Sequence, residues 1–170
     1  MRGRFFIQLM RFALFVAAQV LVFNHINLGG FINAWVYVIF ILMLPIDTPG
    51  WLRLVSSFLM GLSVDIFAQT PGLHATAATL VAFIRPAIMR SIASNKEIEP
   101  GLRPTLFDMG ARWYFLYAFM MIMIHHIFLF YFEVLSFRHF FDTLMQAFLS
   151  GLLTLGLSYL SQYLFYFKKK

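Results

Sequence analysis

The sequence predicts an all-α protein that crosses a membrane with six helices, and three observations lead to this fold class. Of 170 residues, 61% are hydrophobic and only 12% are charged, with a mean hydropathy of +0.80. A soluble domain carries roughly 25% charged residues. The charges gather in short segments between apolar stretches that are long enough for a bilayer core of about 30 Å. Basic residues fall at alternate ends of these stretches, as membrane topology requires.

The predicted helices form a single transmembrane domain over residues 1–170. They cover, in order, about residues 5–23, 31–46, 51–68, 72–89, 113–132 and 140–167. The first follows Arg2 and Arg4 as a secretory signal would, but no A-x-A-like cleavage site ends it, so we expect it to remain as a helix. The second is short and ends at Pro45, and the sixth is long enough to require tilt.

The third and fourth predicted helices begin with the same three residues. Thr-Pro-Gly occurs at 48–50 and at 70–72, and threonine suits the cap and proline the first position of a helix. Near the end of the fourth helix, Pro86 should weaken the helix, and Arg85 should extend its charge outward to the interface.

The basic residues predict that both termini are cytoplasmic. With the N-terminus inside, twelve of the thirteen lysines and arginines fall on the cytoplasmic side, and Arg138 alone falls outside. The cytoplasmic loop 91–112 is the longest connection. In it Leu102, Leu106 and Met109 are spaced for a short helix on the membrane surface, and a flexible polar connector is the alternative.

Asp65 is an acid within the third predicted helix, about five residues before its outer end. A carboxylate at the bilayer centre costs about 3 kcal/mol and less toward the interface, so it should have a partner. Ser57, Gly61 and Asp65 share one small and polar helix face, which suits close contact with a neighbouring helix. A hairpin with the fourth helix would bring His74 to the depth of Asp65, so we expect these two residues to pair.

Several further polar residues are predicted to lie in the outer half of the membrane. They are Gln19, His74, His125, His126, Asp142 and Gln146. Three interpretations stay open: an outward-facing cavity for a ligand, a docking surface for a partner, or separate hydrogen bonds between helices that mark no site. The candidates for partner or ligand binding are Asp65, Gly61, Gly72, His74, His125 and Gln146.

The sequence gives little support for catalysis, and we expect no enzyme activity, cofactor or metal site. There are no cysteines, and neither H-E-x-x-H nor G-x-S-x-G occurs. His125 and His126 are adjacent, so they project about 100° apart on a helix and cannot easily hold one metal. The net charge of +6 is explained by topology and by contact with membrane lipids, and we expect no nucleic-acid partner.

The whole chain resembles the MreD family of bacterial rod shape-determining membrane proteins. The resemblance lies in its length, its six predicted spans, its basic ends and the pattern Gly61-x3-Asp65-x6-Gly72. It implies a fold similar to the substrate-binding S-components of energy-coupling-factor (ECF) transporters and a place in the bacterial cytoplasmic membrane. It also implies a scaffold that binds MreC and, through it, MreB, RodA and a class B penicillin-binding transpeptidase, and so helps to direct lateral peptidoglycan synthesis.

The alternative function is a substrate-binding subunit of a vitamin transporter, similar to an S-component. That function would use the outer polar residues as a ligand cavity. In the first helix, Ala13-x3-Ala17 resembles the small-residue motif by which S-components bind their coupling subunit. Short outer loops favour the scaffold, because they leave little chain to close over a ligand.

Overall fold

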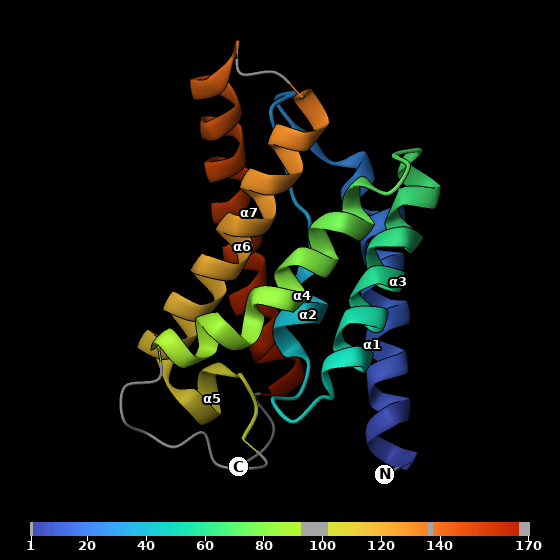
Figure 1. The fold of residues 1–170 in the computed structure, drawn as a ribbon, viewed down its shortest axis with the longest axis vertical. Helices are drawn as coiled ribbons and strands as arrows, with labels where there is room; N and C mark the ends of the chain where they lie inside the picture. The colour runs from blue at the N-terminus through green and yellow to red at the C-terminus, as the bar shows by residue number, and fades with distance from the viewer. Residues whose placement is uncertain (1, 93–101, 136–137, 167–170) are drawn as a thin grey trace.

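The computed structural model describes residues 2–92, 102–135 and 138–166, and long helices dominate it (Figure 1). In the described part of the chain, five helices are long and apolar enough to cross a membrane. They are α1 (Arg2–Leu21), α3 (Gly50–Ala68), α4 (Leu73–Ile92), α6 (Ala111–Val134) and α7 (Phe140–Tyr166). Large apolar side chains on their outer faces are exposed, as lipid contact requires, among them Leu14, Leu59, Phe83, Leu116 and Leu160.

The prediction of a helix over residues 31–46 is wrong. A short 3-10 helix η1 (Phe23–His25) is followed by a hairpin of two strands, β1 (Asn27–Leu28) and β2 (Ile32–Asn33). The chain then runs through irregular backbone into α2 (Val38–Met43), which has only six residues. The apolar run alone could not reveal this, because a segment enclosed by other helices can receive its hydrogen bonds from their side chains.

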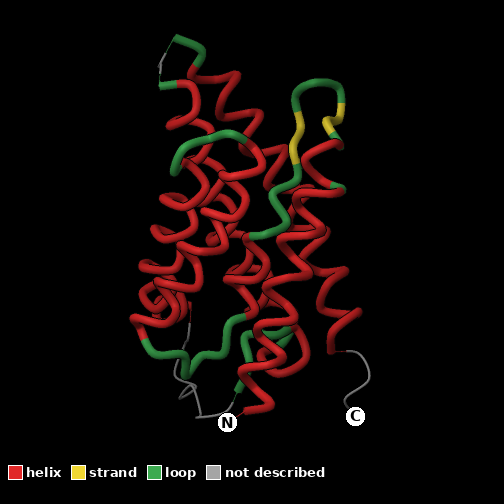
Figure 2. The backbone as a smooth tube through the Cα atoms, turned by 90° about the vertical axis from the view of Figure 1, so that its right-hand side faces the viewer, coloured by secondary structure: helices red, strands yellow, loops and turns green. Residues whose placement is uncertain are grey.

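Residues 31–46 nevertheless pass from one end of the bundle to the other. The hairpin lies at the end where α1 finishes, and α3 begins at the opposite end (Figures 1 and 2). We call these the hairpin end and the terminal end, because α1 starts and α7 finishes together at the second. The turn between α3 and α4, the end of α6 and the start of α7 all lie at the hairpin end. In the part of the chain that the structure describes, five long helices and one irregular segment therefore run between the two ends of the bundle.

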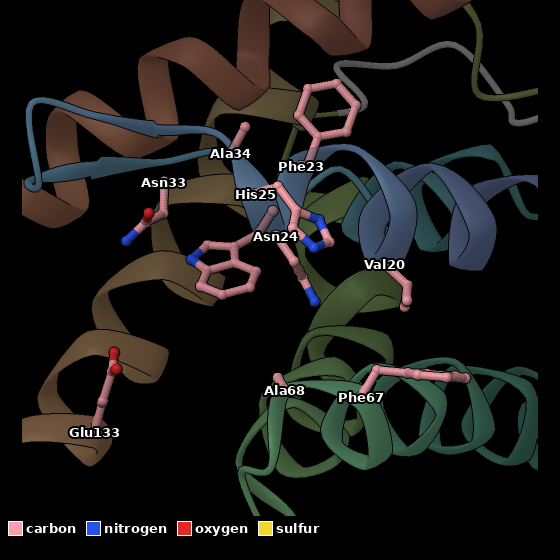
Figure 3. Close-up of a pocket in the computed structure, with 10 residues that line it drawn as sticks. Val20, Phe23, Asn24, His25, Asn33, Ala34, Phe67, Ala68 and Glu133 are labelled. Atoms are coloured by element: carbon pink, nitrogen blue, oxygen red, sulfur yellow. The ribbon is translucent and has the colours of Figure 1, made fainter.

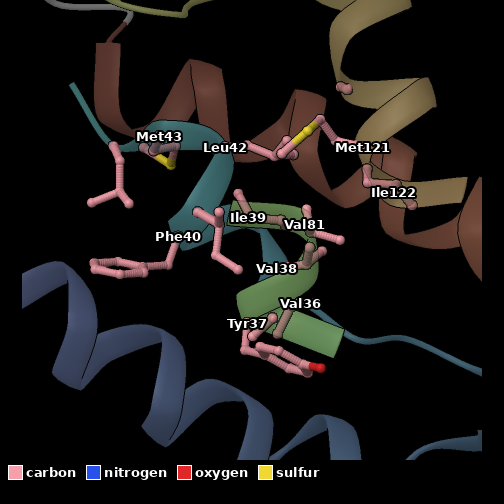
Figure 4. Close-up of a cluster of buried hydrophobic side chains, with 14 of the residues drawn as sticks. Val36, Tyr37, Val38, Ile39, Phe40, Leu42, Met43, Val81, Met121 and Ile122 are labelled. Carbon is pink, nitrogen blue, oxygen red and sulfur yellow. The ribbon is translucent and has the colours of Figure 1, made fainter. Parts of the chain in front are cut away.

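Helix α2 lies at the centre of the hydrophobic core, with α1, α4, α6 and α7 around it (Figure 4). All six of its residues are buried, and none is more than 2% exposed. In a membrane the surrounding lipid is as apolar as the core, so this burial stabilises the protein mainly through close packing. The centre of the bundle is thus occupied by the irregular segment that contains α2.

Helix α4 continues through Pro86 to Ile92, three residues beyond its predicted end. Proline has no N–H, so the carbonyl of Ala82 one turn earlier loses its usual helical donor. The Nε of Arg53 on α3 donates to this carbonyl at 2.9 Å. A side chain from the neighbouring helix thereby replaces the missing bond.

Residues 93–101 of the predicted cytoplasmic loop 91–112 lie outside the described part of the chain, and the described residues of this loop lie at the terminal end. Residues 91 and 92 belong to α4. A single helical turn, α5 (Leu106–Met109), agrees in part with the predicted surface helix. Thr105 caps it, since its hydroxyl oxygen accepts the backbone N–H of Asp108 at 3.1 Å.

Candidate functional site

The carboxylate of Asp65 caps the start of α4. Its Oδ1 accepts the backbone N–H of His74 and its Oδ2 that of Ala75, both at 2.9 Å. These are the N–H groups that a side chain at the N-cap position would normally satisfy, but that position holds Gly72, which has none. The positive end of the α4 dipole also favours a negative charge here. Asp65 is therefore a cap supplied by the preceding helix.

The predicted pairing of Asp65 with His74 is correct in position but wrong in the groups that meet. The carboxylate contacts the backbone of His74, while the imidazole Nδ1 lies 3.1 Å from the hydroxyl of Tyr37. The hydroxyl of Thr70 donates the third hydrogen bond that this carboxylate accepts, to Oδ1 at 2.9 Å. Asp65 is 4% exposed, so an acid this deeply buried has its acceptor capacity met by three donors in the turn that follows it.

Gly61 lets α3 and α4 touch through their backbones. A Cβ atom at this position would lie 2.5 Å from the Cα of Ala75 and closer still to the carbonyl oxygen of His74. Backbone atoms cannot move aside as the end of a side chain can. The expected contact face of α3 is confirmed, since Ser57, Gly61 and Asp65 are all buried.

Gly72 has a different role from the close approach that the sequence suggests. Its φ is +80°, and nothing lies within 4 Å of the position that a Cβ would take. The turn requires glycine for its left-handed backbone, and the space around it is open. Gln69, with φ of 57°, ends α3 in the same turn. The turn 69–72 is thus a tightly specified structure with a free outer face.

Gln19 on α1 forms hydrogen bonds with the backbone of the irregular segment 31–46. Its Oε1 accepts the backbone N–H of Tyr37 at 3.3 Å, and its Nε2 donates to the carbonyl of Ala34 at 3.1 Å. The side chain is only 1% exposed. An amide both donates and accepts, so it can bond non-helical backbone much as a neighbouring strand would.

Helix α7 satisfies further backbone groups of the same segment. The hydroxyl oxygen of Ser150 accepts the N–H of Asn33 at 3.1 Å, and that of Thr154 accepts the N–H of Trp35 at 3.3 Å. A stripe of small residues on α7 is also buried, namely Ala147, Gly151 and Thr154, and a Cβ at Gly151 would meet the side chain of Met123 on α6. The stripe therefore serves both helix packing and hydrogen bonding.

Two side chains nearer the terminal end satisfy carbonyls at the end of α2. The hydroxyl of Tyr117 donates to the carbonyl of Leu42 at 3.1 Å, and the guanidinium of Arg85 donates to that of Leu44. Arg85 also donates to Tyr117 at 2.7 Å. The expectation that Arg85 extends to the interface is wrong: it is 1% exposed, because these carbonyls offer acceptors inside the bundle.

A chain of hydrogen bonds crosses the core through the hydroxyl of Tyr37. It links His74 on α4 with His125 and His126 on α6, and it continues to Thr154 on α7. The Tyr37 hydroxyl lies 2.6 Å from Nε2 of His125, whose Nδ1 lies 3.4 Å from Nδ1 of His126. Nε2 of His126 in turn lies 3.1 Å from the hydroxyl of Thr154. All of these side chains are buried, and the chain ends at Thr154 inside the bundle.

The partners of the rings allow one consistent direction of proton donation. Nδ1 of His126 must donate to the carbonyl of Ile122, 2.9 Å away, because a carbonyl only accepts. His125 can then accept at Nδ1 and donate from Nε2 to Tyr37, whose hydroxyl donates to His74. Both ring nitrogens of His125 and of His126 are engaged in hydrogen bonds, and no group of three metal-binding side chains is found among the described residues.

The structure brings some of the predicted site residues together and leaves others apart. Asp65, Gly61 and Gly72 build the α3–α4 turn, and His74 and His125 meet through Tyr37. Gln146 is half-buried on α7 and is not part of this network. The sequence analysis did not identify Tyr37 or the roles of Ser150 and Thr154, because it expected polar side chains to bond between helices. The unusual shortness of the predicted second helix could have indicated them, since a non-helical segment needs hydrogen-bond partners for its backbone.

A cavity of about 540 Å³ opens at the hairpin end (Figure 3). Asn33 and Glu133 lie on one side of it, Phe67 and Ala68 on another, and the end of α1 closes the rest. Its lining residues are Val20, Phe23, Asn24, His25, Asn33, Ala34, Trp35, Phe67, Ala68 and Glu133. The predicted cluster of outer polar residues lies mainly in the core, so this cavity is lined by a different set.

No protein-family model matches the chain, and no curated protein or solved structure matches it.

Proposed function

We propose that the chain is a non-enzymatic scaffold subunit of the bacterial cell-elongation complex, of the MreD kind. It binds MreC and, through it, works with MreB, RodA and a class B penicillin-binding transpeptidase in lateral peptidoglycan synthesis. One observation supports the proposal: the three residues of the resemblance, Gly61, Asp65 and Gly72, all shape the hairpin of α3 and α4.

The proposed mechanism is the rigid presentation of a surface. The buried polar side chains are used by the protein to hold its own backbone, and this fixes the hairpin 27–33 and the turn 69–72 at one end of the bundle. That end is the proposed docking surface for MreC outside the cytoplasm. The terminal end carries Arg53, Arg90, Arg103 and Arg112, and faces the cytoskeletal side in this proposal.

The proposed location is the bacterial cytoplasmic membrane, crossed six times with both termini inside. Five crossings are the long helices, and the sixth is the irregular segment 31–46. Its buried position supports this topology, because non-helical backbone at membrane depth is tolerated only when protein encloses it.

Two experiments test the function together. The first co-expresses the tagged chain with MreC from the same genome and purifies it in mild detergent, and the expected result is a stable complex of the two. The second depletes the chain in its own cells, and the expected result is loss of elongation and rounding. Failure of the complex to form, with cell shape unchanged on depletion, would reject the scaffold function.

The S-component-like alternative is supported by the cavity at the hairpin end. Its volume of about 540 Å³ falls in the range of roughly 300–1,000 Å³ that is usual for small-molecule sites. Native mass spectrometry of the purified chain separates the two functions. A bound small molecule, together with a vitamin requirement on depletion, would favour transport, whereas bound MreC favours the scaffold.

A further inference from the structure

The walls of the cavity at the hairpin end carry polar, charged and aromatic groups that favour one kind of occupant. The indole of Trp35 forms part of the wall. Asn24 uses its amide oxygen to accept from Gln19, so it offers N–H donors. This amide suits an occupant with a carbonyl oxygen.

Glu133 gives the cavity a negative charge. It is an exposed acid at the end of α6, and it forms no ion pair with a residue that the structure describes. Phe23 and Phe67 add apolar and aromatic surface to the wall. The walls therefore fit a group that combines carbonyl oxygens, an apolar stem and a cationic end. A lysine or arginine residue in an extended polypeptide has all three.

The shape of the cavity favours a polypeptide over a small molecule. Sites for small molecules enclose most of their ligand. This cavity is only partly enclosed, and its walls come from four separate segments at the hairpin end (Figure 3). An open cavity of this kind can receive side chains from a partner whose backbone lies across its mouth.

We propose that this cavity binds an extended basic segment of a partner protein, with a lysine or arginine directed at Glu133 and a backbone carbonyl at the Asn24 amide. The inference rests on the proposed scaffold function and identifies where the partner's chain outside the lipid is held. It assigns the recognition to residues outside the Gly61–Asp65–Gly72 turn.

A fluorescence titration tests this inference directly. The chain has three tryptophans, so W51F with W113F leaves Trp35 as the single reporter on the cavity wall. The probes are acetyl-Ala-Arg-Ala-amide and acetyl-Ala-Glu-Ala-amide, added to the protein in nanodiscs. We expect a saturable change in Trp35 emission with the arginine peptide, and binding at least tenfold weaker with the glutamate peptide.

Two variants supply the decisive comparison. E133Q should weaken binding of the arginine peptide at least tenfold. D142N removes an acid at the same end that is not on the cavity wall, and it should leave binding unchanged. If the double tryptophan variant does not fold, thermophoresis of the wild-type chain measures the same ratios.

The contradicting results are distinct. A flat titration, equal binding of the two peptides, an E133Q variant that binds as the wild type does, or free argininamide bound as tightly as the peptide would overturn the inference. The scaffold function can fail separately. If MreC co-purifies while the titration is flat, only the cavity inference falls; if the peptide binds but no complex forms, the scaffold function falls.

Discussion

The Oδ2 atom of Asp65 accepts the backbone N–H of Ala75 at 2.9 Å, across the turn that joins α3 to α4. The same carboxylate accepts the N–H of His74, so one acid on α3 replaces the cap that α4 lacks. This relationship explains why an acid is kept within an apolar helix. It also means that the contributions of the Asp65 carboxylate and the His74 imidazole to stability can be measured separately.

Replacement of Asp65 by alanine should destabilise the protein by about 2–4 kcal/mol, because it leaves buried N–H groups without an acceptor. Replacement of His74 by phenylalanine keeps the backbone N–H and removes only the contact with Tyr37, so the loss should be smaller. Thermal unfolding in detergent, followed by circular dichroism, compares the two. Equal losses would show that the imidazole, and not the backbone, is the partner of the acid.

Gly61→Ala should cost about 1–3 kcal/mol, since the added methyl group meets the backbone of α4 at 2.5 Å from the Cα of Ala75. Gly156→Ala is the matched control. That glycine is also in a helix, but nothing lies within 4 Å of its Cβ position, so alanine should be neutral or slightly stabilising. Unfolding in increasing SDS measures both. A tolerated alanine at position 61 would refute the close backbone contact.

Arg53 and Pro86 should be coupled, although they lie on different helices. Arg53→Met removes the donor to the Ala82 carbonyl and should destabilise the protein in the wild-type background. In a Pro86→Ala background the alanine N–H can restore the helical bond, so the same change should cost less. A double-mutant cycle should give a coupling of about 1–2 kcal/mol. Additive effects would show that the arginine acts in some other way.

Gly72 distinguishes folding from docking. Alanine and leucine at this position meet the same backbone strain at φ of +80°, and both side chains would extend into open space. Their effects on unfolding should therefore be similar. If the turn touches MreC, leucine should reduce co-purification severalfold more than alanine does. Equal recovery of the complex with both variants would place the partner elsewhere.

The sequence predicts the ends of the five long helices to within about three residues. An apolar run of this length in a membrane can satisfy its backbone hydrogen bonds in few ways other than as a helix. The sequence also predicts the buried face of α3 from Ser57, Gly61 and Asp65. It fails for residues 31–46, because an enclosed irregular segment is as apolar as a helix. The roles of Arg85, Gln19 and Thr154 could not be predicted for the same reason: their partners are backbone groups that a helix would have satisfied itself.

The central claim is that residues 31–46 cross the membrane as an irregular segment, so that the hairpin and the start of α3 lie on opposite sides. The chain contains no cysteine, so single-cysteine variants give an unambiguous test. Leu28→Cys in the hairpin and Asp47→Cys before α3 are treated with a membrane-impermeant maleimide in intact cells. We expect labelling at position 28 at once and at position 47 only after the cells are permeabilised. Labelling of both positions from the same side would contradict the account.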